Sequence, residues 1–380
     1  MDTDPLFDDG LAVRLTGPED VLAYLPYRFG FVPTEALAIL QVLEAEPGQI
    51  TLGLAARLDL AELARPSVLR ASMTALRDQL ARDPSIAALT VLYSDIEPQG
   101  VSAGWGVAGR VLRQWLAEFP LADPASTFLV TSTTYRCLQC AEPPCCPTAG
   151  RPVVELRDTA VAAQMVLAGR MLVASREDLA CPRDASAERA AVAARAAQRE
   201  RRAMRTRSPE QQRRWRRSVL DRYGRLREQA RANPTRWDAD PAELGRLSAA
   251  LTDPDLRDAV VAWSLTGRRL PPGSIAVLEA FGGIVTGGSA IPGTEHLDAA
   301  GAVLTEVARH TGPGRGGYPL AVLAWLAWWR GDGARADVLR RQSLDDDPVN
   351  TLSRLLEEVL VGGVRPGWAL PGPTVATPGR

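Results

Sequence analysis

The sequence predicts an α/β N-terminal domain, a mixed sheet with helices, followed by an Arg-rich helical connector and an all-α C-terminal domain. Short aliphatic and β-branched runs alternate with helical stretches up to about residue 180, which is the pattern of a sheet covered by helices. Beyond about residue 238 the pattern is helical, and no segment is convincing as a strand. The chain has 380 residues, of which 46% are hydrophobic, so it is long enough for two cores.

The first domain begins with a helix toward Tyr27, because Thr16-Gly17-Pro18-Glu19 has the spacing of a capping box. Glu46-Pro47-Gly48 predicts a turn between the first two strands. The predicted strands cover residues 36–43, 49–58, 86–93 and 127–135. The predicted helices cover residues 60–81, 107–119 and 159–171.

The domain boundaries follow from changes in composition. We predict an α/β domain with a cysteine loop over 1–182, an Arg-rich helical connector over 183–236, a helical domain over 237–364 and a disordered tail over 365–380. The helical domain has candidate helices at 253–265, 296–310, 319–330, 334–344 and 350–360. Gly282-Gly283 and Gly287-Gly288 predict a flexible loop, and the absence of a following GK[ST] excludes a phosphate loop there.

The connector has an unusual charge. Between Arg195 and Arg217 there are ten arginines and two glutamates, a net charge of +8, so the remainder carries −9 in a chain whose total is −1. The sequence Ser208-Pro209-Glu210-Gln211 has the spacing of a capping box with a first-turn proline, which predicts two helices in this region.

Composition excludes several functions. All 44 basic residues are arginine, so no lysine can act as Schiff base, general base or phosphate-loop cation. The first ten residues are acidic, unlike a secretory signal, and the longest apolar run, 318–329, is too short to cross a bilayer. We therefore expect a cytoplasmic protein without membrane association, in which a stable disulfide is disfavoured.

A cysteine cluster occupies a proline-rich segment, YRCLQCAEPPCCPTAGRPV, over residues 135–153. Three interpretations stay open: a structural zinc site, a disulfide or redox clip from Cys140 to Cys145 or Cys146, and packing of a stiff loop. The adjacent pair argues against zinc, since two neighbouring sulfurs do not easily reach one ion, and we predict no metal. The candidate thiols are Cys137, Cys140, Cys145 and Cys146.

Charged residues at strand ends are the candidates for a ligand site, because ligands in α/β domains bind at the carboxyl ends of strands. Arg57 and Asp59 end one predicted strand, and Asp95 follows another. The structural alternative is an ion pair of Arg57 and a helix cap by Asp59. We predict no catalytic residue, and the enzyme question stays open with no activity favoured.

The arginine-rich helices raise the possibility of nucleic-acid binding, with Trp215 and Tyr223 as candidates for stacking on bases. Against it, the arginines fall on all sides of the predicted helices, which favours pairing with the acidic remainder of the chain. The candidate anion-binding residues are Arg201, Arg202, Arg213, Arg214, Arg216 and Arg217.

The C-terminal domain contains one hairpin with the spacing of a tetratricopeptide repeat, from Leu323 to Pro348. Its tryptophans, Trp325, Trp328 and Trp329, are core residues in one interpretation and a partner groove in the other. The two histidines, His296 and His310, are too far apart for a same-face metal pair.

Several motifs together resemble an actinobacterial family known as domain of unknown function 4192. They are LPYRFGFVPTEAL (25–37), LAARLDL (54–60), CAEPPCCPTAGRP (140–152), GRMLVASRE (169–177) and YPLAVLAWLAWWRGDGARA (318–336), continuing to DDDP (345–348). The resemblance implies a bacterial cytoplasmic protein of two parts and assigns no activity. The family pattern has cysteines matching Cys140, Cys145 and Cys146 but none at Cys137, which weakens any site that needs all four thiols.

The leading hypothesis from the sequence is a non-catalytic protein-interaction or regulatory protein whose helical domain docks a protein partner. One alternative is an enzyme or small-ligand sensor that uses the crevice near Asp59 and Asp95. A second alternative is nucleic-acid binding through the Arg-rich helices. No cofactor is predicted, apart from the zinc alternative at the cysteines.

Overall fold

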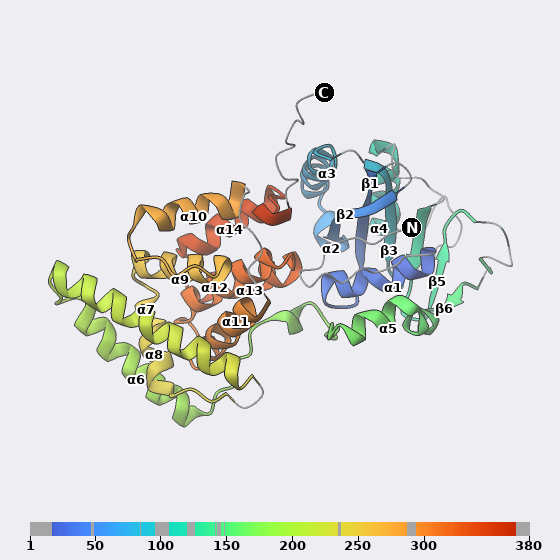
Figure 1. Cartoon of the computed structure of the whole chain (residues 1–380). Coiled ribbons are helices and arrows are strands. Elements are labelled where there is room, and N and C mark those ends of the chain that lie inside the picture. Colours follow the sequence, from blue (N-terminus) through green and yellow to red (C-terminus); the bar gives the residue numbers. More distant parts are fainter. Residues whose placement is uncertain are drawn as a thin grey trace, which may run out of the picture. The chain divides into compact units, whose positions relative to one another are not determined.

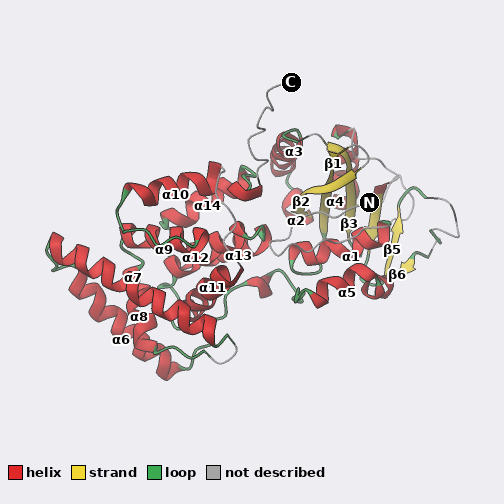
Figure 2. Cartoon of the chain, in the orientation of Figure 1, coloured by secondary structure: helices red, strands yellow, loops and turns green. Residues whose placement is uncertain are grey.

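The computed structural model describes residues 17–46, 49–83, 85–95, 106–119, 126–140, 142, 146–147, 149–234, 237–286 and 294–369. The chain divides into two compact units, residues 1–176 and 177–380 (Figure 1). The described strands belong to the first unit, and helices make up most of the second (Figure 2). The predicted fold class, an α/β part followed by Arg-rich helices and an all-α part, is confirmed.

The first unit is built on a mixed sheet in the order β2-β1-β3-β4-β5-β6. Its strands are β1 (Ala36–Glu46), β2 (Gln49–Asp59), β3 (Ser85–Tyr93), β4 (Thr127–Val130), β5 (Thr134–Cys137) and β6 (Arg151–Pro152). The β3–β4 pair is parallel and the other neighbours are antiparallel. Helix α4 (Gly106–Glu118) lies between the parallel strands in sequence, as a crossover requires.

Helices cover both faces of this sheet because residues along each strand alternate between faces. Leu37, Ile39 and Leu92 share one core with α2 (Leu60–Leu63), α3 (Pro66–Leu80) and α4. The neighbouring residues Ala36, Ala38 and Tyr93 are also buried, on the opposite face. The helices α1 (Pro18–Phe29) and α5 (Ala160–Leu167) pack against each other on that side (Figure 1).

Two predicted elements of the first unit are interrupted. The helix predicted over 60–81 is two helices, because Pro66 lacks an N–H and starts α3 at its first position. The strand predicted over 127–135 is a hairpin, β4 and β5, with the Thr131 amide donating to the Thr134 carbonyl at 2.8 Å. The predicted turn residues Pro47 and Gly48 lie outside the described residues.

The second unit is a helical assembly around one large core. Its helices are α6 (Ala187–Met204), α7 (Pro209–Ala232), α8 (Pro241–Ala250), α9 (Pro254–Thr266), α10 (Ile275–Thr286), α11 (Thr294–Arg309), α12 (Gly317–Trp329), α13 (Gly333–Asp346) and α14 (Thr351–Val361). The predicted capping box is present at α7, where Ser208 and Gln211 exchange side chain-to-backbone hydrogen bonds of 2.8 and 3.3 Å. Among the residues described here, no helix is both long and apolar enough to cross a membrane.

Two segments predicted as irregular contain regular structure. Gly282 and Gly283 lie inside α10, so the loop prediction is wrong there, because apolar residues on both sides make this segment part of the core. Gly287 and Gly288 lie outside the described residues. In the predicted tail, residues 367–369 form a short 3-10 helix, and the Trp368 indole donates to the carbonyl of Trp329 at 2.7 Å.

Candidate ligand-binding site

A pocket of about 230 Å³ opens in the first unit where the parallel strands β3 and β4 end. Its walls come from α1, the loop before β1, the two strand ends, the 3-10 helix η2 (Val153–Asp158), α5 and Leu172. Most of the lining is apolar, and polar groups gather at the strand ends. The pocket therefore lies where ligands bind in open α/β sheets, at the carboxyl ends of strands around a crossover.

Glu35 shapes one side of this pocket and is held in an unusual conformation. Its φ of 42° is the one positive value for a non-glycine residue in the described part of the chain. The carboxylate accepts hydrogen bonds from the Ser94 hydroxyl at 3.0 Å and the Asp95 amide at 3.2 Å, and the Glu35 carbonyl accepts from the Leu60 amide at 2.9 Å. These bonds hold a left-handed backbone that is unfavourable for glutamate, and such strain is common at binding sites.

Asp95 connects the two strand ends. Its carboxylate accepts from the Ser132 amide at 2.6 Å, while the Ser94 amide donates to the Val130 carbonyl at 3.1 Å. Asp95 is exposed and lines the pocket, so it brings negative charge to the rim together with Glu35. Arg157, from η2, is exposed on the same lining and makes no ion pair with the described residues. The rim therefore presents charges of both signs.

Tyr93 is the most informative group in the pocket. The residue is 3% exposed, and its hydroxyl makes no hydrogen bond with any residue that the structure describes. Burial raises the pKa of Tyr93 well above its ordinary value, so the hydroxyl is protonated at neutral pH. A buried hydroxyl without a partner destabilises a protein, and a polar atom of a bound ligand would relieve that cost.

The other two strand-end candidates have structural roles. The Asp59 carboxylate accepts from the Ala61 amide at 3.1 Å and so caps α2, and it lies 3.4 Å from the Arg57 guanidinium. That guanidinium lies 5.5 Å from the centre of the Phe31 ring. Asp59 and Tyr93 both pair with Ala36 of β1, so the predicted acids share one sheet edge. Of the three candidates, Asp95 alone lines the pocket.

The cysteine segment contributes to a separate pocket of about 320 Å³. Cys137, at the end of β5, lines it together with Cys140 and Cys146, and all three are half-buried. Cys145 lies outside the described residues. Within the described residues, no three histidine, cysteine or acidic side chains come close enough to hold a metal ion. The zinc, disulfide and packing interpretations of this segment stay predictions.

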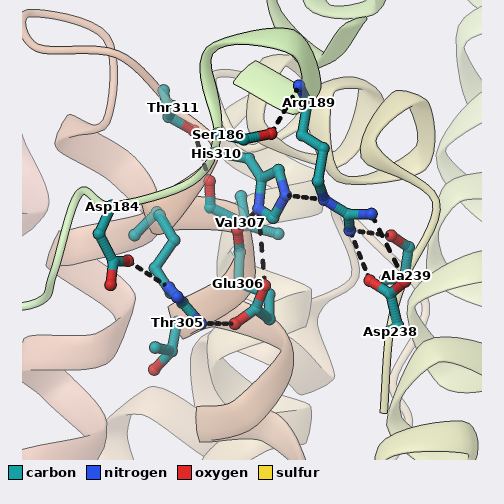
Figure 3. Close-up of polar contacts among 12 residues, drawn as sticks. Asp184, Ser186, Arg189, Asp238, Ala239, Thr305, Glu306, Val307, His310 and Thr311 are labelled. Atoms are coloured by element: carbon teal, nitrogen blue, oxygen red, sulfur yellow. Dashed lines mark hydrogen bonds and ion pairs between the residues drawn. The ribbon is translucent and has the colours of Figure 1, made fainter. Parts of the chain in front are cut away.

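A buried polar cluster in the second unit surrounds His310, which is 4% exposed (Figure 3). Its Nε2 accepts a hydrogen bond from Nε of Arg189 at 3.1 Å, so Nδ1 is the protonated nitrogen and donates to the Glu306 carbonyl at 2.8 Å. The same guanidinium donates to the Ala239 carbonyl at 3.0 Å and pairs with Asp238. His310 thus connects the start of α6 to the end of α11.

Arg309 extends this cluster toward the segment that precedes α6. It donates to the carboxylates of Asp184 and Glu306, at 2.7 Å each. The hydrogen bond from Arg309 lowers the pKa of Asp184 below its ordinary value. His296, the other histidine, lies beside Arg227, with Nδ1 3.4 Å from its guanidinium. Both histidines thus contact an arginine of another helix, Arg189 of α6 or Arg227 of α7.

The candidate arginines separate into two groups. Arg216 pairs with Asp253 and Asp255 on α9, and Arg214 pairs with Glu210 one turn earlier. Arg201 is half-buried, and burial, together with Arg315, lowers its pKa. The remaining candidates are exposed and make no ion pair with described residues: Arg202, Arg213 and Arg217.

The aromatic candidates are not available as exposed surfaces. Tyr223 is fully buried, with its hydroxyl 2.7 Å from that of Ser264. The tryptophans considered for a partner groove belong to the core of the second unit and are at most 3% exposed: Trp325, Trp328 and Trp329. The groove interpretation is therefore wrong for this structure, and the core interpretation holds, because α12 is apolar on all sides and is enclosed by its neighbours.

Sequence reasoning missed Glu35 and Tyr93. Glu35 lies just before a predicted strand and Tyr93 lies at the end of another, and the sequence there indicates only the strands. Backbone strain and an unsatisfied hydroxyl cannot be inferred from a sequence. One signal in the sequence did point to this region, namely the family motif LPYRFGFVPTEAL. It contributes six lining residues of the pocket: Pro26, Tyr27, Val32, Pro33, Thr34 and Glu35.

Comparison with known proteins identifies a family. A family model described as a domain of unknown function (DUF4192) matches residues 18–271 and 289–367. Neither the curated proteins nor the solved structures give a significant match.

Proposed function

Because this chain belongs to the DUF4192 family, whose description assigns no activity, we propose a function from geometry: the first unit binds a small polar metabolite in the strand-end pocket. One observation carries the proposal. Tyr93 lines the pocket, and its buried hydroxyl has no partner among the described residues, at the crossover where α/β sheets bind ligands.

The chemistry of the lining suggests the ligand class. The volume of about 230 Å³ is below the roughly 300–1,000 Å³ of pockets for drug-sized ligands, so the ligand has few atoms. Apolar residues of α1, η2 and α5 suit an apolar body, while the rim offers Arg157 for an anionic group and Asp95 for a cationic one. A molecule of amino-acid size that carries both charges fits these features.

The hydrogen bonds of the two pocket carboxylates favour a binding function over a catalytic one. Glu35 and Asp95 already accept hydrogen bonds from backbone and hydroxyl donors that connect the ends of the strands. These bonds tie both carboxylates to the ends of the strands, so their oxygens are already engaged in contacts within the protein. We therefore assign both carboxylates to holding the pocket open and orienting a ligand.

The test is a thermal-shift screen of the full chain with the twenty amino acids, small amines and small carboxylic acids. A ligand at a hundred times its Kd stabilises the protein by about 2.7 kcal/mol, which a melting curve resolves. Tyr93→Phe should behave in two opposite ways: it raises the melting temperature without ligand, by removing an unsatisfied hydroxyl, and it reduces the shift that the ligand causes.

Asp59→Asn is the matched control for Asp95→Asn, because both remove one charge at the same sheet edge and asparagine preserves the cap of α2. Asp95→Asn and Arg157→Gln should weaken the ligand shift, whereas Asp59→Asn should leave it unchanged. If no compound stabilises the wild type, or if all the variants respond as the wild type does, the pocket is not the binding site.

A further inference from the structure

Helix α6 has two faces of different chemistry. Its inner face is alanine, with Ala193, Ala196 and Ala197 buried, and it packs against α8. On its outer face, Arg195, Arg199 and Arg202 are exposed. These positions follow the i, i+4, i+7 spacing of one helical face, whereas Arg189 and Arg201 lie on other sides of α6. The sequence interpretation that arginines fall on all sides therefore holds for the helix as a whole, and the three exposed arginines form one stripe within it. The three arginines lie about 6 and 4.5 Å apart along the axis.

Further exposed arginines lie where α6 ends and α7 begins. Arg205 follows the last turn of α6, and Arg213 and Arg217 lie on the first turns of α7, all of them exposed. We call Arg195, Arg199, Arg202, Arg205, Arg213 and Arg217 the arginine face. None of these six makes an ion pair with the residues that the structure describes. By contrast, the less exposed Arg207 and Arg216 are paired with acids.

The junction of α6 and α7 is held in one conformation by Glu200. Its carboxylate accepts from the Trp215 indole at 2.7 Å and from Arg207 at 2.8 Å, and the Arg207 guanidinium lies 4.6 Å from the centre of the Trp215 ring. This arrangement ties the ends of both helices together, so binding to the arginine face requires little ordering of the backbone. It also covers the Trp215 ring, which is therefore a poor platform for stacking bases.

The neighbourhood of the arginine face adds positive charge. Arg201 lies on the same helix, and its pKa is lowered by burial and by the charge of Arg315 from the loop before α12. Like charges brought together without an acidic partner are unfavourable, and an external anion relieves that repulsion.

We propose that the arginine face binds the phosphate backbone of double-stranded nucleic acid without reading its sequence. Guanidinium groups hydrogen-bond phosphate oxygens in a bidentate way, and a row of exposed arginines matches a polyanion that carries one charge per about 1.7 Å. With Tyr223 buried and Trp215 covered, base stacking contributes little, which disfavours single strands. A membrane surface fits less well, because α6 directs its apolar side chains toward α8.

The test measures fluorescence anisotropy of labelled 20-base-pair duplexes, DNA and RNA of two unrelated sequences, with the full chain from 50 to 300 mM salt. We expect equal affinity for both sequences and a steep fall with salt. For the variant R195Q/R199Q/R202Q, the slope of log affinity against log salt concentration should be shallower by about 2.7, which is 0.9 for each of three phosphates that are no longer neutralised. The same variant should bind at least about tenfold more weakly at 0.1 M salt. Glutamine preserves the helix propensity of α6, which circular dichroism verifies.

The matched control, R268Q/R341Q/R354Q, removes the same charge from exposed arginines elsewhere in the second unit and should keep the slope. The proposal is overturned if the wild type does not bind a duplex at 50 mM salt, or if both triple variants lose affinity equally. Stronger binding of poly-glutamate, or of phosphatidylserine vesicles, through the same three arginines would also overturn it, in favour of an acidic protein or a membrane. Tyr93→Phe should bind duplexes normally, so this test is independent of the strand-end pocket.

Discussion

The contact of α6 with α8 depends on a single glycine, and Gly245→Ala should disrupt it. A Cβ atom at Gly245 would lie 2.7 Å from the carbonyl carbon of Ala193 and 2.8 Å from its Cα, and closer still to the carbonyl oxygen. Those atoms are backbone, so no side-chain rotation relieves the overlap. Ordinary carbon–carbon contacts are about 3.5–4.0 Å, so the two helices must separate by roughly 1 Å.

The expected magnitude combines two opposing effects. Alanine in a helix interior is favoured over glycine by about 1 kcal/mol. Overpacking costs typically about 1–3 kcal/mol, and a 1 Å gap forfeits a quarter to a half of the dispersion energy along the alanine seam. The balance is a loss of about 2 kcal/mol or more in the free energy of unfolding, which corresponds to about 4–8 °C in the melting temperature of a unit this size.

Gly301→Ala is the matched comparison, since Gly301 lies inside α11 and a Cβ there meets no atom within 4 Å. This variant should gain about 0.5–1 kcal/mol. Urea unfolding of the full chain, followed by circular dichroism, measures both. If Gly245→Ala is as stable as the wild type, the close approach of α6 and α8 is not a feature of the protein, and the placement of the arginine face on a fixed helix loses its basis.

Further predictions concern the second unit. Ser208→Ala removes the cap of α7 and should destabilise the protein by about 1 kcal/mol in urea unfolding, whereas Ser208→Asp should retain most of the stability. His310→Phe leaves Nε of Arg189 without its acceptor and should lower the free energy of unfolding by about 1–3 kcal/mol; an unchanged midpoint would contradict the role given to His310. Burial raises the pKa of Cys181 to about 11, so iodoacetamide at pH 8 should leave that thiol unmodified in the folded chain and modify it in urea. Because the folded pKa lies above the unfolded one, the stabilisation from the neutral thiol is full below about pH 8.5 and is lost as the pH rises through 11, a loss that Cys181→Ala should lack.

Much of the fold was predictable because the deciding signals are local. Alternating aliphatic runs located the strands, and Ser208 with Gln211 located the start of α7, since each signal acts within a few residues. The errors arose where a proline interrupts a helix or where a tertiary contact determines the secondary structure. Pro66 splits a continuous helical pattern, and Gly282 lies in a helix because the core of the second unit encloses its apolar neighbours.

The candidate sites were less predictable because their key properties are relations between distant residues. Asp59 and Asp95 follow strands in the same way, yet one caps a helix and the other lines a pocket. Arg216 and Arg217 are adjacent in the sequence, but only Arg216 faces the acids of α9. Which arginine is neutralised inside the protein is therefore decided by helix packing, and a charge count over the segment does not contain that information.

The β-bridge between Phe31 and Val173 also has a consequence for the folding of the first unit during synthesis. The Val173 amide donates to the Gly30 carbonyl at 3.0 Å, so the end of this unit is tied to its beginning. During synthesis, some 140 further residues must be translated after α1 before its packing partners η2 and α5 are present. At about 5–20 residues per second this takes roughly 7–28 seconds. The wall of the pocket is thus completed last, and a nascent chain that stops before residue 153 carries the strands of the site without the means to enclose a ligand.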